Sequence, residues 1–189
     1  MIIGITGTNG SGKDTVADIL IKKLGWLHFS LSDELRDICR ERNIESTRDN
    51  LIKFAREIRN ERGLDYLSQR VLNKVSDNFI VTSIRNPAEV EPFKKSDKFI
   101  LIAVDAPIEV RYQRMISAGK GRSGYKVGEE NMSLEEFKNK EQIEMQGTGA
   151  DQQLQILIDM ADTKIENNGT IEELENKVDE LLLSLNLLE

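Results

Sequence analysis

The sequence predicts an α/β fold in which helices cover both faces of a parallel β-sheet. Five apolar runs have the length of strands, and the stretches between them carry the apolar spacing of helices. Three of these runs are nearly continuous in Ile, Val, Leu and Phe, as expected for strands that are buried on both faces. The 189 residues contain no repeat, low-complexity tract or linker rich in Pro, Gly or Ser, so we expect residues 1–189 to form a single domain.

The strands are expected, in chain order, at Met1–Thr6, Trp26–Ser30, Asn78–Ser83, Phe99–Asp105 and Thr163–Glu166. Three later helices carry N-terminal capping signals, in which a capping residue stands three positions before a Glu. These signals are Asn86-Pro87-Ala88-Glu89, Ser133-Leu134-Glu135-Glu136 and Thr170-Ile171-Glu172-Glu173. The last helix repeats apolar residues and is expected to dock on the sheet, although dimerisation through it remains open. Two segments interrupt the alternation of strands and helices: a helical insert at Leu31–Asp77, and a polar, Gly-containing loop at residues 118–131.

A glycine-rich run follows the first strand directly. It reads Gly7-Thr8-Asn9-Gly10-Ser11-Gly12-Lys13-Asp14-Thr15 and matches the phosphate-binding loop pattern G-x-x-x-x-G-K at each fixed position. Glycines allow backbone angles that turn successive amide N–H groups toward an anion, and the next helix adds its positive N-terminal end. The charge of Lys13 can follow the β- and γ-phosphates of a nucleotide. The run therefore predicts a nucleotide-binding loop.

Asp14 stands where this loop usually carries Ser or Thr, whose hydroxyl contacts Mg²⁺. We therefore expect the metal ion to be contacted by Asp14, through its carboxylate or a water, or by Thr15. The sequence does not choose between these two residues.

Composition excludes several other functions. The 26 basic and 33 acidic residues give a net charge of −7, which argues against a nucleic-acid-binding surface. The chain has no apolar run of 18 residues and no signal peptide, so a cytoplasmic protein with no membrane partner is expected. Cys39 is the single cysteine, which excludes an internal disulfide, and no Cys/His cluster suggests zinc. His28, the only histidine, is expected to be a structural strand residue.

Arginines predict a second phosphate site. Arg85 follows the third strand, at the edge of a parallel sheet where ligands bind. Four of the arginines in the helical insert are further candidates: Arg36, Arg56, Arg59 and Arg62. A guanidinium matches a phosphate with two parallel hydrogen bonds, so these residues could hold a second phosphorylated molecule facing ATP. Ordinary solvated helix charge, paired with Glu at helical spacing, is the alternative for the four helical arginines.

Two further residues are candidates for catalysis. Phosphoryl transfer needs cations around the transferring group and the exclusion of water. A loop at 118–131 that carries Arg122 would supply both as a lid, and a merely solvated loop is the alternative. Asp33 follows the second strand and could accept a proton from an attacking hydroxyl or bind a water on Mg²⁺, or it could cap the next helix.

Together these residues resemble the P-loop small-molecule kinases, namely the nucleoside monophosphate kinases and the dephospho-coenzyme A kinases. The resemblance covers nearly the whole chain and is carried by Gly7–Thr15, Asp33, Arg85, Val104–Pro107, Arg111, Arg114 and Met160–Thr170. It implies a five-stranded sheet in the order 2-3-1-4-5, an acceptor-binding insert at 31–77 and a lid at 118–131. It also implies that Asn168 and Gly169 lie near the adenine, and that Lys13, Asp33, Arg85 and Arg122 serve catalysis. The Gly-Lys-Asp end of the loop is more similar to deoxynucleoside monophosphate kinases and animal-type phosphomevalonate kinases.

The resulting hypothesis is an ATP- and Mg²⁺-dependent kinase of a small phosphorylated metabolite, acting as a monomer or homodimer. A nucleoside monophosphate, with deoxynucleotides included, is the leading acceptor, and dephospho-coenzyme A is the second. A hypothesis from another class is a nucleotide-gated switch or regulatory ATPase that transfers phosphate only to water. The chain offers no separate effector domain for such a switch.

Overall fold

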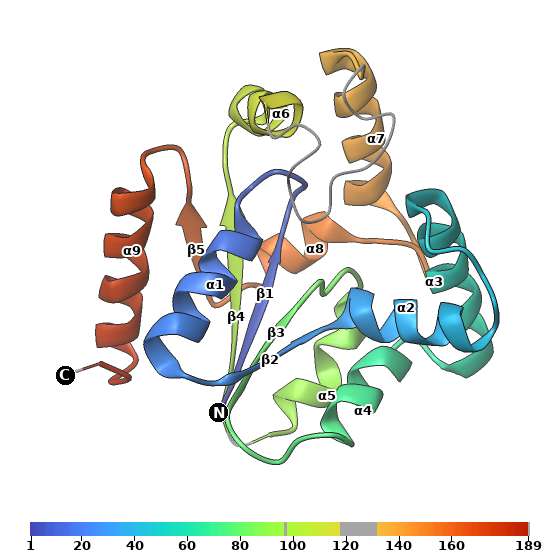
Figure 1. The fold of residues 1–189 in the computed structure, drawn as a ribbon, viewed down its shortest axis with the longest axis horizontal. Helices are drawn as coiled ribbons and strands as arrows, with labels where there is room; N and C mark the ends of the chain where they lie inside the picture. The colour runs from blue at the N-terminus through green and yellow to red at the C-terminus, as the bar shows by residue number, and fades with distance from the viewer. Residues whose placement is uncertain (97, 118–131, 189) are drawn as a thin grey trace.

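The computed structural model describes residues 1–96, 98–117 and 132–188. Its middle layer is a parallel sheet in the order β2-β3-β1-β4-β5 (Figure 1). The strands are β1 (Ile2–Gly7), β2 (Leu27–Ser30), β3 (Phe79–Thr82), β4 (Phe99–Asp105) and β5 (Thr163–Glu166). All five predicted strands are confirmed to within one residue at each end, and the expected strand order is confirmed as well.

Helices pack on both faces of the sheet. One face is covered by α1 (Lys13–Leu24) and α9 (Ile171–Ser184). The other face is covered by α2 (Leu31–Glu41), α4 (Tyr66–Leu72), α5 (Glu91–Lys94) and α8 (Leu154–Asp159), with α3 (Arg48–Arg62) packed against α2 and α4. Beyond the carboxyl ends of the strands lie α6 (Ile108–Ser117) and α7 (Leu134–Gln146), at the top of Figure 1. A short 3₁₀ helix, η1 (Pro87–Glu89), follows β3.

The sheet divides the core into two clusters of buried side chains. Alternate strand residues point to opposite faces, because successive side chains of a strand alternate. Ile3 and Ile5 of β1 pack beneath α1 and α9, whereas Ile2 packs with the helices of the other face. In that second cluster the rings of Phe79 and Phe93 lie 6.1 Å apart and hold α5 against β3. The three central strands, β1, β3 and β4, are therefore apolar and buried on both faces, as the sequence predicts.

The predicted helix starts are confirmed in detail. Asn86, Ser133 and Thr170 each accept a backbone hydrogen bond and are paired with the expected Glu in a capping box. The last helix docks on the sheet as expected, since Leu174 and Val178 of α9 are buried against the α1 face.

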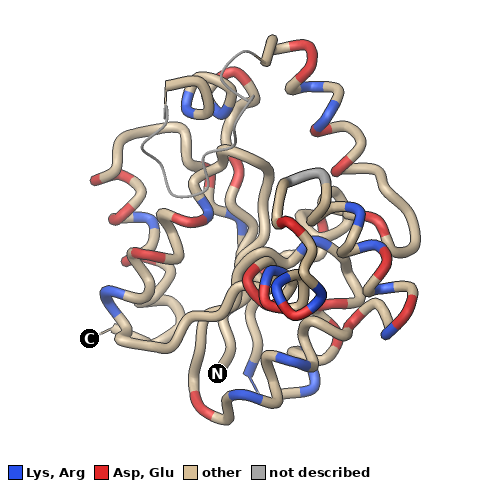
Figure 2. Tube along the Cα trace, turned by 45° about the vertical axis from the view of Figure 1, so that its right-hand side comes forward, with Lys and Arg blue, Asp and Glu red and all other residues tan. Residues whose placement is uncertain are grey.

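Basic and acidic residues are interspersed along the surface helices (Figure 2). None of the helices in the described ranges combines the length and the apolar content that a membrane crossing requires.

Candidate active site at the carboxyl edge of the sheet

The glycine-rich loop joins β1 to α1 and takes a conformation that only glycine allows. Gly7 has φ 148° and Gly12 has φ 90°, in the region that side chains rarely adopt. A Cβ atom on Gly7 would lie 2.1 Å from the carbonyl oxygen of Val104, and one on Gly12 would lie 2.2 Å from Asn167 Nδ2. Lys13, the first residue of α1, is buried, and its Nζ donates to the Thr8 carbonyl oxygen at 3.3 Å. The loop is thus a tightly packed cradle.

Two neighbouring strand ends hold the loop in place. Thr8 Oγ1 donates to Asp105 Oδ1 at 2.9 Å, at the end of β4. Asn167, just after β5, donates from Nδ2 to the carbonyl oxygen of Ser11 at 2.8 Å. Within the described residues, the buried hydroxyl of Ser11 has no hydrogen-bond partner. An unpaired hydroxyl inside an amide-lined loop fits a phosphate oxygen.

A buried arginine connects the loop to the two helices above the sheet. Arg111 of α6 donates from Nε to the Ala106 carbonyl oxygen at 2.6 Å and from Nη1 to that of Asn9 at 3.3 Å. The same guanidinium pairs with the Glu141 carboxylate on α7, with Nη2 and Oε1 2.9 Å apart. It also lies 5.9 Å from the centre of the Phe137 ring. These contacts make α6 and α7, which flank residues 118–131, part of the loop's surroundings.

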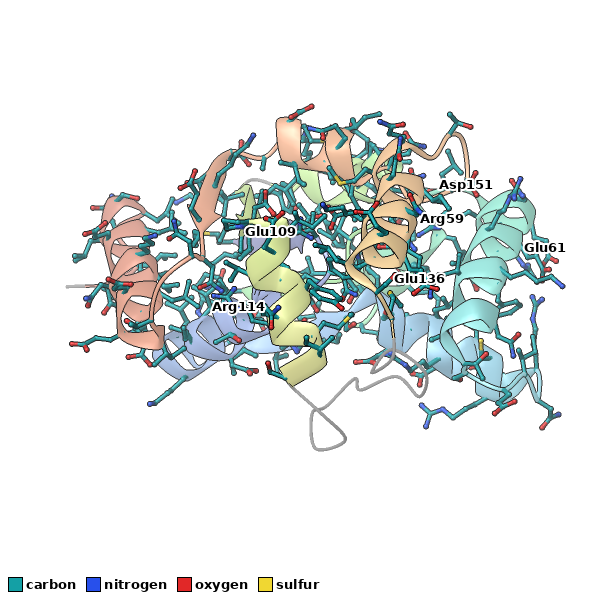
Figure 3. The ribbon with its side chains drawn as sticks, turned by 90° about the horizontal axis from the view of Figure 1, so that it is seen from above. Arg59, Glu61, Glu109, Arg114, Glu136 and Asp151 are labelled. Carbon is teal, nitrogen blue, oxygen red and sulfur yellow. The ribbon has the colours of Figure 1, made fainter. Side chains whose placement is uncertain are left out.

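Arg114, one turn further along α6 and labelled in Figure 3, donates from Nη2 to Asn167 Oδ1 at 3.4 Å. Asn167, which follows β5 and holds the glycine-rich loop, is therefore also hydrogen-bonded to α6. Together these contacts place the guanidinium groups of Arg111 and Arg114 at the phosphate-binding loop, with the carboxylates of Asp105 and Glu141 beside Arg111.

A cavity of about 720 Å³ lies where β2 and β3 end, since Leu31 and Ser32 after β2 and Ser83 and Arg85 after β3 line it. Its apolar lining comes from α2, α3, α4, α7 and the chain after α7, and consists of Leu31, Leu35, Leu51, Ile52, Ala55, Leu67, Ile143 and Ala150. Its charged lining consists of Arg36, Lys53, Arg56, Arg59, Arg85, Glu89, Lys140, Glu144 and Asp151. Thr6 Oγ1 donates to the Ile84 carbonyl oxygen at 3.1 Å and so joins the segment after β3 to the end of β1. Loop and cavity therefore share one edge of the sheet.

Glu89 organises the floor of this cavity. Its carboxylate is fully buried and accepts from Arg59 Nη2 at 2.8 Å, from the backbone N–H of Arg85 at 2.8 Å and from that of Asn86 at 3.0 Å. Arg59 also donates to the Ala150 carbonyl oxygen at 3.0 Å. Figure 3 shows Arg59 near Asp151, where α3 approaches the chain after α7. The buried pair joins three separate segments.

Arg85 differs from Arg59 in having an unsatisfied nitrogen. Within the described residues, its Nη1 is buried and has no hydrogen-bond partner. A buried charged donor left unpaired is costly, so such a group is commonly reserved for a ligand. Arg56 by contrast pairs with Asp151 at 3.4 Å, and both side chains are largely exposed.

Comparison with known proteins places the chain in a family. The profile of an AAA domain matches residues 3–138. A UPF0200 protein of Sulfurisphaera tokodaii is 34% identical over 96% of this chain and 95% of its own length. The chain belongs to the AAA-domain family and to the UPF0200 proteins. The UPF0200/UPF0201 protein of Archaeoglobus fulgidus is also 34% identical over 97% of this chain, which spans 55% of that protein.

The fold of this UPF0200 protein is that of the P-loop small-molecule kinases, so the predicted resemblance is confirmed. A shikimate kinase from Acinetobacter baumannii in complex with shikimate superimposes with a TM-score of 0.58. The alignment covers 99% of this chain and 95% of that one, with 21% identical residues. At this identity the likeness concerns the fold alone.

Most of the predicted nucleotide-binding residues belong to the glycine-rich loop between β1 and α1. Asp14 is exposed in the first turn of α1 and Thr15 is half-buried, so both oxygens remain candidates for Mg²⁺. No group of three or more His, Cys, Asp or Glu that could hold a metal occurs in the described ranges. Asn168 and Gly169 are exposed beside the buried Asn167.

The predicted acceptor residues divide into two groups. The cavity lining includes Arg36, Arg56, Arg59 and Arg85. Asp33 and Arg62 are exposed, and neither belongs to the lining that the described residues form. Asp33 instead pairs with Arg36 on the surface of α2, at 2.6 Å. Arg122 and the proposed lid at 118–131 lie outside the described residues.

Sequence reasoning missed three residues of this site. Asn167 immediately precedes the predicted Asn168, but nothing in the sequence tells which of the two faces the loop. The sequence pattern predicts only a capping role for Glu89, which the residue does fulfil. Gln152 has no motif around it, and only the folded chain brings it to the cavity.

Proposed function

We propose that this protein transfers the γ-phosphoryl group of ATP to a small phosphorylated metabolite, and that the acceptor is a nucleoside or deoxynucleoside monophosphate. The observation that carries the proposal is the unpaired, buried nitrogen of Arg85 in a cavity at the same edge of the sheet as the nucleotide loop. A nucleotide-gated switch requires only the loop. A kinase requires both a loop for ATP and a second anion site at the same edge of the sheet.

The chemistry follows from these two sites. An oxygen of the acceptor phosphate attacks the γ-phosphorus of ATP, the bond from that phosphorus to the bridging oxygen breaks, and ADP leaves. The attacking oxygen is already ionised at neutral pH, so no general base is required. Lys13 and the loop amides would neutralise the charge that develops on the transferring group.

Magnesium ion would accompany ATP and neutralise phosphate charge, since it prefers carboxylate, hydroxyl and water oxygens. Asp14 and Thr15 on the loop, and Asp105 beside it, carry such oxygens. They are the residues that we propose to hold the ion, directly or through water.

The lining of the cavity supports an acceptor that carries a phosphate and a planar base with apolar faces. Arg36, Arg56 and Arg85 offer cations, while the leucines of α2 and α3 offer an apolar surface. Dephospho-coenzyme A would accept through a ribose hydroxyl and would need a base, for which Asp33 is the candidate. The exposed position of Asp33, paired with Arg36, favours the monophosphate.

The test is ADP release with a panel of acceptors. We expect ADP release to depend on a nucleoside monophosphate, with the phosphorylated product identified by mass spectrometry. ADP release that is equal with and without every acceptor would instead support the regulatory ATPase. Preferred turnover of dephospho-coenzyme A, with a loss of about 10²-fold or more in Asp33→Asn, would make Asp33 the base.

Arg85 and Arg62 provide a matched pair of variants. Arg85→Ala should raise the acceptor KM by about 10- to 150-fold, the effect of losing one charged hydrogen bond, and leave ATP binding nearly intact. Arg62→Ala removes an exposed arginine outside the cavity lining and should change KM less than about threefold. Equal KM values for the two variants would place the acceptor phosphate elsewhere.

A further inference from the structure

The segment Gly149–Gln153 is held against the cavity floor by its backbone. Asn86 Nδ2 donates to the carbonyl oxygens of Gly149 and Asp151, at 2.8 and 2.9 Å. The backbone N–H of Gln153 donates to the Arg85 carbonyl oxygen at 2.9 Å, and Arg59 holds the carbonyl oxygen of Ala150. These bonds come from α3 and from the chain after β3, so the segment is fixed from two sides.

Within this well-bonded segment the side chain of Gln152 is an exception. Its Oε1 atom is buried and has no hydrogen-bond partner among the described residues, and Gln152 lines the cavity. Arg85 Nη1 is the second such atom in the same lining. Buried polar atoms are nearly always paired, so an unpaired donor and an unpaired acceptor in one cavity indicate two polar points of one ligand.

The same cavity lining also contains apolar side chains. Leu31 and Leu35 come from α2, Leu51 and Ile52 from α3, and Ile143 from α7. Ile143 is 75% exposed and Ile52 is 41% exposed, so both keep apolar surface that a ligand could cover. A planar ring placed against these side chains would bury their exposed apolar surface.

We propose that Gln152 is a specificity-determining residue that hydrogen-bonds the nucleobase of the acceptor, while Arg85 binds its phosphate. This inference rests on the proposed function. A glutamine amide presents an acceptor oxygen next to an N–H donor, which matches adjacent donor and acceptor groups on the edge of a base. A sugar phosphate without a base has no such edge and leaves the apolar surface of the cavity uncovered.

The experiment compares nucleotides with the same phosphate lacking a base. Wild type, Gln152→Met and Gln155→Met are assayed with the preferred nucleoside monophosphate and with ribose 5-phosphate. Gln155 is the matched control, because it lies exposed on α8, donates to Asp159 at 3.0 Å and is absent from the cavity lining. We expect Gln152→Met to lower kcat/KM for the nucleotide by about 10- to 100-fold. Its kcat/KM for ribose 5-phosphate and both values of Gln155→Met should stay within about threefold of wild type.

Each other outcome overturns a defined part of the reasoning. An equal loss with both acceptors would show that Gln152 only supports the structure, and no loss would show that it does not touch the base. A wild-type enzyme that prefers ribose 5-phosphate would overturn the inference and leave a kinase. Failure to phosphorylate any acceptor, with ATP bound, would overturn the proposed function and the inference with it.

Discussion

The buried pair of Arg59 and Glu89 allows a prediction of stability. The two side chains are 4% and 0% exposed, and the Glu89 carboxylate accepts from Arg59 at both Nε and Nη2. In Arg59→Met the chain keeps most of the side-chain volume but loses the cation. The carboxylate is then left buried with only its two backbone donors, those of Arg85 and Asn86.

Removing one member of a buried ion pair costs about 3–5 kcal/mol of unfolding free energy. For a domain of this size each kcal/mol lowers Tm by about 2–4 °C, so we expect a loss of about 6–20 °C. Arg56→Met is the matched control on the same helix, one turn earlier. Its ion pair with Asp151 joins side chains that are 63% and 40% exposed, and such pairs contribute less than about 1 kcal/mol.

Urea unfolding followed by the fluorescence of Trp26, the only tryptophan, gives the free energies of both variants. The double variant Arg59→Met/Glu89→Gln should recover part of the loss, because it removes the uncompensated charge as well. A cost below about 1 kcal/mol for Arg59→Met, or a cost equal to that of Arg56→Met, would refute the reasoning from burial.

Three further predictions concern the nucleotide loop and the edge strand. Lys13→Ala should lower kcat by about 10²–10³-fold at saturating ATP, because Lys13 stabilises charge on the transferring phosphoryl group. Lys22→Ala, on the exposed side of α1, should leave kcat unchanged. A kcat of Lys13→Ala within about threefold of the wild-type value would contradict this role. Gly12→Ala should abolish ATP binding in equilibrium titrations, because the added Cβ would clash with Asn167. Gly25→Ala is the control: its Cβ meets nothing within 4 Å, so only its positive φ of 66° should lower stability, and ATP binding should be unchanged. Burial lowers the pKa of His28 against the opposing field of Asp33, so the folded state resists its protonation. The contribution of His28 to the unfolding free energy should therefore be constant above about pH 6.5 and fall below it. The unfolding free energy of His28→Asn should then fall less steeply below that pH than that of wild type, and parallel pH profiles would disprove this.

Most of the fold could be predicted because its signals are local. The strand Phe99–Asp105 is an uninterrupted apolar run and was predicted to the residue. The helical insert was predicted as one stretch, yet its division into α2, α3 and α4 was not. The breaks lie at Asn43, with φ 56°, and at Gly63, with φ 107°. Gly63 is the only glycine of the insert and is a local signal for a helix end, but nothing local shows which of the insert's four asparagines adopts the left-handed region.

The site separates into a predictable and an unpredictable half. The nucleotide loop is encoded in nine consecutive residues, so its pattern was visible in the sequence. The cavity joins segments that are far apart in the chain. The spacing of Arg56, Arg59 and Arg62 places them on one helix. Only the fold sets Glu89 opposite Arg59 and leaves the other two arginines on the surface. Whether an arginine binds a ligand or supports the structure depends on what lies opposite it.

The bond from Asn167 to Ser11 has a consequence for folding kinetics. It connects positions that are 156 residues apart, and the bond from Thr8 to Asp105 spans 97. Contacts of such separation close long loops and form slowly. A chain emerging from the ribosome therefore carries the complete nucleotide motif long before it can hold the loop in shape. ATP binding should therefore begin only after β4 and β5 have joined the sheet. A refolding assay with a fluorescent nucleotide could measure the rate of that step directly.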